Sequence, residues 1–221
     1  MSFGGKDLKE APGGIAFSGN WETCYRANLW SRIASRILWR VADFSYRNEA
    51  ELYAAARAVA WPRHFPVQRK IRVNVTAQNS PLRSLEFATL KVKDAVCDVF
   101  RDKSGTRPDV DRAAPDVRIH AFLEEAKGML YLDTSGEALF KRGWRMDIAE
   151  APLRENLAAG IIMLSGWKFD QPLLDPMCGG GTLLSEAAAM ARGRGPWRRP
   201  PRGSCRRRTW GRERARRAAS R

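Results

Sequence analysis

Hydrophobic positions recur along this chain with two different periods, and each period predicts a different kind of element. Residues 70–78 alternate strictly, with Ile71, Val73 and Val75 on one side, which is the pattern of a half-buried strand. Similar short apolar segments predict further strands at residues 13–19, 39–45, 117–123 and 129–135. In residues 20–38 apolar side chains recur every four positions, which favours one long amphipathic helix.

Three more helices are predicted from apolar stripes and from residues that commonly begin or end helices. They cover residues 48–61, 81–100 and 151–167. Ser80 and Pro81 are expected to begin the second, as a hydroxyl cap followed by proline at the first helical position. Gly166 is expected to end the third. Because strands and helices alternate without a long repeat, the sequence predicts a fold of the α/β or α+β class.

A glycine-rich turn follows the last of these helices. Residues 172–175 predict a short strand, and the sequence "DPMCGGGT" (residues 175–182) connects it to another helix. Its glycines permit positive φ and let a ligand approach the backbone closely. Thr182 is expected to cap the helix, whose first N–H groups attract an anion. Asp175 can accept hydrogen bonds from the amine or hydroxyl groups of a ligand.

On spacing alone, this turn is either a ligand site or an ordinary corner between a strand and a helix. A phosphate-binding P-loop requires a lysine, which the turn lacks. A dinucleotide-binding fingerprint requires a third glycine at the position where Leu184 stands. These two phosphate-binding motifs are therefore excluded, and the spacing does not decide between the site and the corner.

The residues of the turn carry more information than their spacing. "DPMCGGGT" closely resembles the "DPMCGSGT" cofactor loop of a family of RNA methyltransferases that use S-adenosylmethionine. Residues 151–167 resemble the motif before that loop, residues 91–123 and 130–145 resemble the family's THUMP RNA-binding domain, and residues 13–38 resemble the ferredoxin-like segment ahead of it. The agreement keeps the family's order over roughly residues 10–194, so it is far more specific than one motif.

The resemblance implies an α+β fold with successive parts: a partial ferredoxin-like segment, a THUMP domain, the start of a Rossmann-like α/β methyltransferase domain and an Arg-rich disordered tail. The expected boundaries are residues 1–47, 48–148, 149–194 and 195–221, respectively. The first dozen residues show no clear pattern. The ferredoxin-like segment is therefore expected to lack the first strand and helix of the family.

The resemblance also implies the cofactor and the reaction. S-adenosylmethionine is expected to lie along Asp175, Cys178, Gly179, Gly181 and Thr182. The implied reaction is methyl transfer to the exocyclic N2 of a guanine in 23S ribosomal RNA, which must present that base unstacked. The alternatives are a stand-alone THUMP module that binds RNA without catalysis and, third, a tRNA methyltransferase or thiouridine enzyme that shares the THUMP domain.

The family's catalytic Asn-Pro-Pro-Tyr signature does not occur in the 221 residues. The acidic residue that grips the cofactor ribose in the family has no counterpart either. No catalytic residue is therefore assigned, and the chain is expected to bind RNA without transferring a methyl group.

The formal charge of +15 is concentrated at one end of the chain. Residues 192–221 hold 13 Arg and a single acidic residue, Glu213, and therefore account for +12 of it. Arg without Lys favours a frame-shifted or mispredicted translation over a genuine RNA-binding tail. Elsewhere, basic side chains are candidates for phosphate contacts in a THUMP groove or, alternatively, ordinary solvated charges. They are Lys91, Lys93, Arg107, Arg112, Arg142 and Arg145.

The spacing of the cysteine and histidine residues excludes a structural metal site. The four cysteines are scattered and no CxxC pair occurs, so neither zinc nor disulfides are expected and a reducing compartment fits best. No apolar stretch is long enough to span a bilayer, and the N-terminus lacks a signal sequence. The expected location is the cytoplasm, with no membrane partner; oligomeric state does not follow from the sequence.

Overall fold

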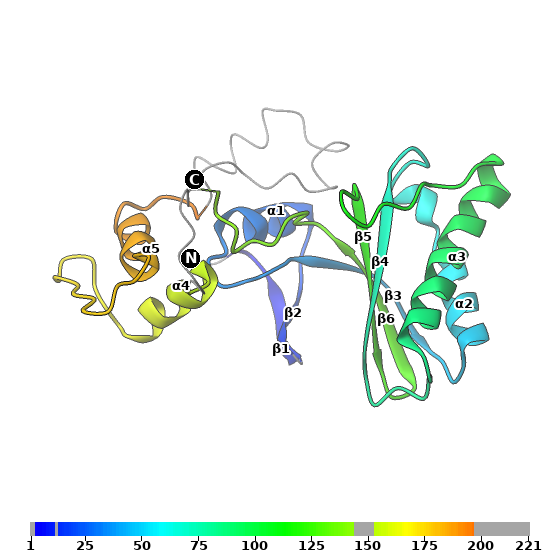
Figure 1. Cartoon of the computed structure of the whole chain (residues 1–221), viewed down its shortest axis with the longest axis horizontal. Coiled ribbons are helices and arrows are strands. Elements are labelled where there is room, and N and C mark those ends of the chain that lie inside the picture. The colour runs from blue at the N-terminus through cyan, green and yellow to red at the C-terminus, as the bar shows by residue number, and fades with distance from the viewer. Residues whose placement is uncertain (1–2, 12, 144–152, 197–221) are drawn as a thin grey trace. The chain divides into compact units, whose positions relative to one another are not determined.

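The computed structural model describes residues 3–11, 13–143 and 153–196 (Figure 1). The chain divides into two compact units. One combines Met1–Ile37 with Glu137–Arg221, and the other is the continuous segment Leu38–Gly136. The second unit is therefore inserted, in sequence, into the first.

The inserted unit is built on a four-stranded mixed sheet. Its strands are β3 (Leu38–Ser45), β4 (Ile71–Gln78), β5 (Val117–Glu124) and β6 (Lys127–Asp133). Their order across the sheet is β3-β6-β5-β4, with β4 and β5 parallel and the other neighbours antiparallel. The parallel pair requires a long crossover between its strands, and a helix provides it.

Two helices cover one face of this sheet: α2 (Glu49–Ala58) and α3 (Leu85–Ser104), the crossover helix (Figure 1). Strand β5 alternates buried and half-buried positions along its whole length, and its buried side faces the helices. The core also contains Trp61, from a short 3-10 helix (Trp61–Arg63), whose indole N–H donates to the carbonyl of Ala56 at 2.8 Å. The apolar alternation of the strands thus predicts the buried face correctly.

The start of α3 differs from the sequence prediction. The helix begins at Leu85 rather than residue 81, and Ser84 is its cap, because the Ser84 hydroxyl accepts from the Phe87 N–H at 3.2 Å. Ser80 instead accepts from the Tyr46 hydroxyl at 2.8 Å and from the Leu82 N–H at 3.2 Å. Ser80 and Ser84 are both suitable helix caps by sequence. Ser80 is used in a tertiary hydrogen bond with Tyr46, so Ser84 caps α3.

The other unit contains a hairpin and three helices in its described residues. They are β1 (Lys6–Ala11), β2 (Gly14–Ser18), α1 (Trp21–Trp30), α4 (Glu155–Leu164) and α5 (Thr182–Ala191). Strand β1 pairs antiparallel with β2, although residues 6–11 show no alternation that predicts a strand. The helix expected over residues 20–38 is wrong in its second half: α1 ends at Trp30, and the Ser31 hydroxyl accepts from the Ala34 N–H at 3.1 Å, which favours a turn.

The end of this unit also differs in part from the prediction. Residues 172–175 form no strand, and Leu174 is 86% exposed. An isolated strand cannot satisfy its backbone groups, and no strand among the described residues lies beside it. The helix predicted over residues 151–167 is shorter in the structure, where α4 covers Glu155–Leu164; residues 151 and 152 lie outside the described part. Gly166 follows the end of α4 with φ of +70°, as expected.

Across the described residues, no helix is long and apolar enough to span a bilayer.

Candidate functional site

The glycine turn folds back on itself before α5. The Gly181 N–H donates to the Cys178 carbonyl oxygen at 2.7 Å, and the Met177 N–H donates to Asp175 Oδ1 at 3.2 Å. Gly179 and Gly181 have φ of +49° and +67°, which residues with a Cβ rarely adopt. A Cβ at either glycine would meet no atom within 4 Å, so the turn needs glycine for its backbone angles and stays open to a ligand.

The first turn of α5 presents backbone donors beside this open space. Gly181 is the N-cap and has no side chain to cap the helix. The prediction that Thr182 is the cap is wrong, because Thr182 is the first helical residue and only 4% exposed. Helix N–H groups without a side-chain cap attract an anion, and the Asp175 carboxylate accepts from amines and hydroxyls. This donor set fits a ligand that carries a carboxylate beside an amine, and the exposed Cys178 lies in the same loop.

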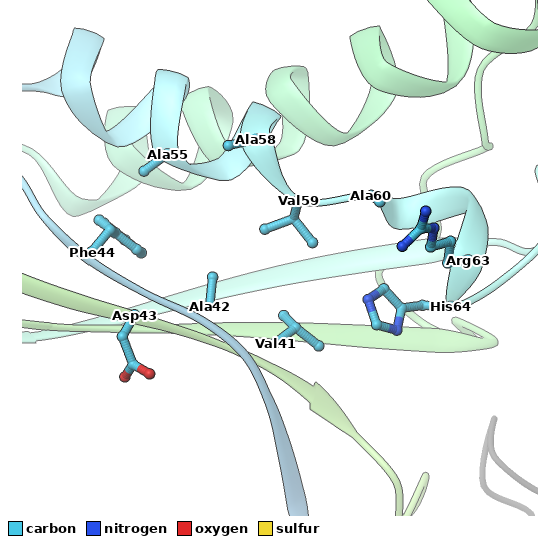
Figure 2. Close-up of a pocket in the computed structure, with 10 residues that line it drawn as sticks. All are labelled: Val41, Ala42, Asp43, Phe44, Ala55, Ala58, Val59, Ala60, Arg63 and His64. Carbon is cyan, nitrogen blue, oxygen red and sulfur yellow. The ribbon is translucent and has the colours of Figure 1, made fainter.

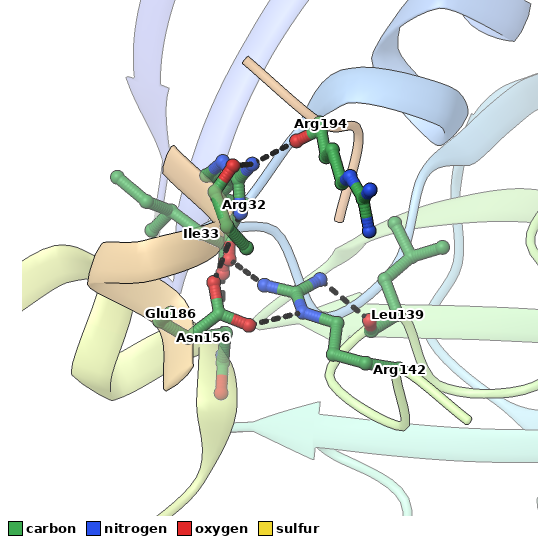
Figure 3. Close-up of polar contacts among 8 residues, drawn as sticks. Arg32, Ile33, Leu139, Arg142, Asn156, Glu186 and Arg194 are labelled. Carbon is green, nitrogen blue, oxygen red and sulfur yellow. Dashed lines mark hydrogen bonds and ion pairs between the residues drawn. The ribbon is translucent and has the colours of Figure 1, made fainter. Parts of the chain in front are cut away.

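Arg142, predicted from the sequence to contact RNA phosphate, is buried against α5 (Figure 3). It is 1% exposed, and its Nε donates to Glu186 Oε1 at 3.1 Å. Its NH1 donates to the carbonyl of Leu139 at 2.7 Å and its NH2 to the carbonyl of Arg32 at 2.5 Å. Burial lowers the pKa of Arg142, and the charge of Glu186 opposes that shift. Every nitrogen of this guanidinium is therefore used inside the protein, and the phosphate contact predicted for Arg142 is wrong.

Arg32 holds the second oxygen of the same carboxylate. Its NH1 donates to Glu186 Oε2 at 3.1 Å, and its NH2 donates to the carbonyl oxygens of Ala189, at 3.4 Å, and of Arg194 (Figure 3). Ala189 lies in the last turn of α5, where carbonyl groups lack partners within the helix. Arg32 therefore binds both the side chain and the C-terminal end of α5.

The segment after α1 is held by residues from much later in the chain. Asn156 Nδ2 donates to the carbonyl of Ile33 and to the hydroxyl of Ser35, both at 3.2 Å, and the Leu139 N–H donates to the Ser35 carbonyl at 2.8 Å. Residues 31–37 leave the helical pattern to make these contacts. Local periodicity contains no signal for partners more than 100 positions away, so the sequence could not predict them.

The inserted unit carries a groove of about 520 Å³ along an open edge of its sheet. Strand β4 is the last strand, and on its free side the described residues add only the isolated bridge between Ile71 and Val110. The groove is lined from β4, α3 and the loop that follows α3. Its charged lining residues are Arg72, Glu86, Lys93 and Arg112, with Leu90 and Val110 as apolar contacts.

Arg72 organises the cations of this groove. Its Nε donates to Asn74 Oδ1 at 3.1 Å, and its NH1 donates to the carbonyl oxygen of Arg112 at 2.8 Å. Lys93 Nζ lies 2.9 Å from Asp94 Oδ1, so part of its charge is offset. The groove is thus basic, and its strand and its loop are joined by a hydrogen bond from Arg72.

Asp111 orders the loop that carries Arg112. Its Oδ1 accepts from the N–H groups of Ala113 and Ala114 at 2.9 and 3.0 Å, and its Oδ2 accepts from Lys70 Nζ at 3.1 Å. The hydrogen bond from Ala114 and then that from Lys70 lower the pKa of Asp111. The ionised form of Asp111 is therefore the one that holds the loop.

The structure brings together only some of the residues expected to contact RNA. Lys93 and Arg112 both line the groove. Arg72 lines it too, although its alternating position on the strand predicted only that its side chain is exposed. Lys91 is separate, with its Nζ 5.1 Å from the centroid of the Phe87 ring. Arg107 is exposed beyond α3 and does not line the groove. Arg145 lies outside the described residues.

A second hollow, of about 420 Å³, separates β3 from α2 in the same unit (Figure 2). Alanine and valine side chains form most of its lining, with Arg63 and His64 together at one end. Asp43 points away from the hollow (Figure 2). None of the residues singled out in the sequence for chemistry lies here, and within the described ranges no group of three or more His, Cys, Asp or Glu could hold a metal ion.

Comparison with known families gives three matches in sequence order. Residues 1–38 match an RlmL ferredoxin-like domain, residues 46–133 a THUMP domain, and residues 142–219 an RMKL-like methyltransferase domain. With the mixed fold, these matches give the chain the domain order of THUMP-containing methyltransferases. The ferredoxin-like match that precedes the THUMP domain is of the RlmL type, which supports assignment of the chain to the N-terminal part of an RlmL-type protein. The expected α+β fold class is confirmed; the exact domain boundaries stay predictions.

Solved structures of related proteins agree with this assignment. A Listeria monocytogenes protein described as a predicted N6-adenine-specific DNA methylase is 30% identical, with a TM-score of 0.77 over 86% of this chain and 50% of that one. SMU.472, a putative methyltransferase complexed with SAH, is 29% identical, with a TM-score of 0.85 over 97% and 57%. A possible methylase from Clostridium difficile 630 is 28% identical, with a TM-score of 0.84 over the same shares. The chain thus spans about half the length of these relatives.

Proposed function

We propose that this chain provides the cofactor loop and the RNA-binding part of an S-adenosylmethionine-dependent enzyme that methylates N2 of a guanine in 23S ribosomal RNA. The observation that carries the proposal is the open glycine turn at the uncapped start of α5, in a chain whose THUMP domain has a basic groove. The relative SMU.472 was crystallised with SAH, the demethylated form of the same cofactor, which supports this choice of cofactor.

S-adenosylmethionine supplies a methyl group activated by its sulfonium. In this chain, the open space at Gly179 and Gly181 would let its carboxylate reach the first N–H groups of α5, which would hold it. Asp175 would accept from its amine. Cys178, exposed in the same loop, would lie along the cofactor as the family resemblance implies.

The groove in the THUMP domain contributes orientation rather than base choice. Arg72, Lys93 and Arg112 are suited to phosphate oxygens, and such contacts hold the backbone of a nucleic acid without reading its sequence. A guanine N2 must in addition leave its stack to be methylated. The preference for guanine N2 rests on the family resemblance, whereas the printed description of the Listeria relative refers to adenine in DNA.

No side chain of this chain is assigned to hold or deprotonate the guanine amine, because the Asn-Pro-Pro-Tyr signature does not occur in its sequence. We therefore expect the 221-residue chain to bind SAH and RNA and to transfer no methyl group by itself. A THUMP module that binds RNA without a cofactor is the alternative function.

Calorimetric titration with SAH and with a 23S RNA fragment distinguishes these functions. Binding of both ligands supports the methyltransferase, and binding of RNA alone supports the module. Methyl transfer from radiolabelled cofactor is then measured on undermethylated 23S RNA and on an adenine-containing DNA of equal length. Turnover above background on the RNA would place a catalytic group within this chain, and turnover on the DNA alone would contradict the proposed substrate.

A further inference from the structure

A buried carboxylate lies on the helix that follows the cofactor loop. Glu186 is four residues after Thr182, one turn into α5 and on the same side of the helix. It is 0% exposed, and Arg142 and Arg32 each donate to one of its oxygens at 3.1 Å. The rotation of α5 about its axis is therefore coupled to two guanidinium groups.

These guanidinium groups come from segments distant in sequence from the cofactor loop. Arg32 lies in the ferredoxin-like match and is 154 positions from Glu186, and Arg142 is the first residue of the methyltransferase match. Arg32 also bonds the carbonyl of Ala189 near the end of α5. The helix is held at its middle and its end, while its first turn stays available to a ligand.

The charges of this cluster make it rigid. A buried carboxylate that loses its partners is strongly unfavourable, so α5 cannot rotate or slide without breaking both ion pairs. Glu155 is also buried, and its negative charge acts on Arg142 as well. The two carboxylates together offset the charges of the two arginines. By contrast, the apolar contact of α5 with α4 has a small buried centre of Ala159, Ile162, Ala187 and Met190.

We propose that Arg32, Arg142 and Glu186 are positioning residues for the cofactor loop. Through them the ferredoxin-like segment sets the rotation of α5 and, with it, the direction of the N–H groups that the loop offers to a ligand. The proposal rests on the proposed function of that loop as an S-adenosylmethionine site. The three side chains act through α5 and not by contact with the cofactor.

The first test compares SAH affinity in the full chain and in Glu186→Gln, which keeps the size of the side chain and removes its charge. We expect the dissociation constant to rise by about tenfold or more, because breaking a buried pair is far more costly than breaking a surface pair. Glu22→Gln is the matched control: Glu22 pairs with Arg26 at 3.2 Å in the same unit, but on the surface. Its SAH affinity should change by less than about twofold.

The second measurement separates positioning from general unfolding. In Glu186→Gln, amide hydrogen exchange of residues 182–191 should accelerate by about tenfold, while exchange in α3 and RNA binding stay at wild-type values. If Glu186→Gln fails to fold, Arg32→Lys serves instead, since it keeps the charge but loses the forked contacts to the two carbonyl groups. Faster exchange of residues 182–191 is expected in that variant too.

The outcomes are distinct. Unchanged exchange and unchanged SAH affinity in a folded variant would overturn the positioning role. A wild-type chain that binds no SAH would contradict the proposed function, and the exchange data would still decide whether the cluster holds α5.

Discussion

Arg72 on β4 donates from NH1 to the carbonyl oxygen of Arg112 at 2.8 Å, across 40 positions of sequence. The side chain of one cation thereby holds the backbone of another, and both line the same groove. Loss of Arg72 should consequently affect RNA binding in two ways, through its own charge and through the loop that carries Arg112.

Replacement of Arg112 by alanine should weaken RNA binding by removing one phosphate contact. The slope of log K against log salt concentration is expected to fall by about one, because about one fewer counterion is released. Arg72→Ala should weaken binding more than Arg112→Ala, since it also frees the loop. Fluorescence anisotropy with a labelled 23S RNA fragment at several salt concentrations measures both, with the exposed Lys127→Ala as control. Equal salt slopes in wild type and Arg112→Ala would exclude the groove as the RNA contact.

A methyl group at Gly181 should damage the cofactor loop through backbone strain alone. Gly181→Ala is expected to cost about 1–2 kcal/mol at its φ of +67°, although the added Cβ meets no atom. The matched control is Gly160→Ala inside α4, where the Cβ also meets nothing and helix propensity should add roughly 0.5–1 kcal/mol of stability. Calorimetric titration with SAH and thermal melting of both variants give the comparison. Opposite signs are expected, and a stabilised Gly181→Ala would show that the described loop is not the ground state.

The two serines near the start of α3 should respond differently to replacement by alanine. Ser84→Ala removes the cap and should destabilise the first turn by about 1 kcal/mol. Ser80→Ala instead removes the hydroxyl that accepts from Tyr46 and should leave the helix start unchanged. Hydrogen exchange of residues 85–90 distinguishes them. Faster exchange there in Ser80→Ala than in Ser84→Ala would instead support Ser80 as the cap, as the sequence predicts.

Acid should release the loop that carries Arg112. The pKa of Asp111 lies below its ordinary 3.8, so its ionised form stabilises the loop fully above that value, and the stabilisation is lost as the pH falls through the lower, folded-state pKa. The amide chemical shifts of Ala113 and Ala114, followed by NMR from neutral pH to pH 2, should therefore titrate below 3.8. Asp111→Asn should abolish that transition because its side chain does not ionise. A midpoint at or above 3.8 would contradict the hydrogen-bonded arrangement.

Sequence patterns predict the elements of the THUMP unit well because its sheet is half buried. Alternation at Ile71, Val73 and Val75 reports directly which side of β4 faces the helices. The glycines predict the turn for a similar local reason, since its backbone angles restrict which residues can occupy it, whereas its assignment as a cofactor loop rests on the family resemblance. Local rules of this kind describe the loop and the strands without any knowledge of distant residues.

Arg142 shows where such rules stop. An arginine in a polar stretch predicts an exposed charge, and only the folded chain reveals that the Glu186 carboxylate and two carbonyl oxygens enclose it. The same holds for Ile33, which continues the spacing of α1 but gives its carbonyl to Asn156. Residue spacing encodes helix faces and strand faces; it does not encode which distant segment will neutralise a buried charge.

The insertion of one unit into the other fixes an order of events during synthesis. The sheet of the inserted unit is complete once Asp133 has left the ribosome, because β3 pairs with β6. Arg32 must wait for Glu186, which at about 5–20 residues per second emerges roughly 3–10 s later. During that interval the inserted unit has all of its strands, while Arg32 still lacks its partners in α5. The contacts of Arg32 with Glu186, and of Asn156 with Ile33 and Ser35, can therefore form only after the inserted unit is complete.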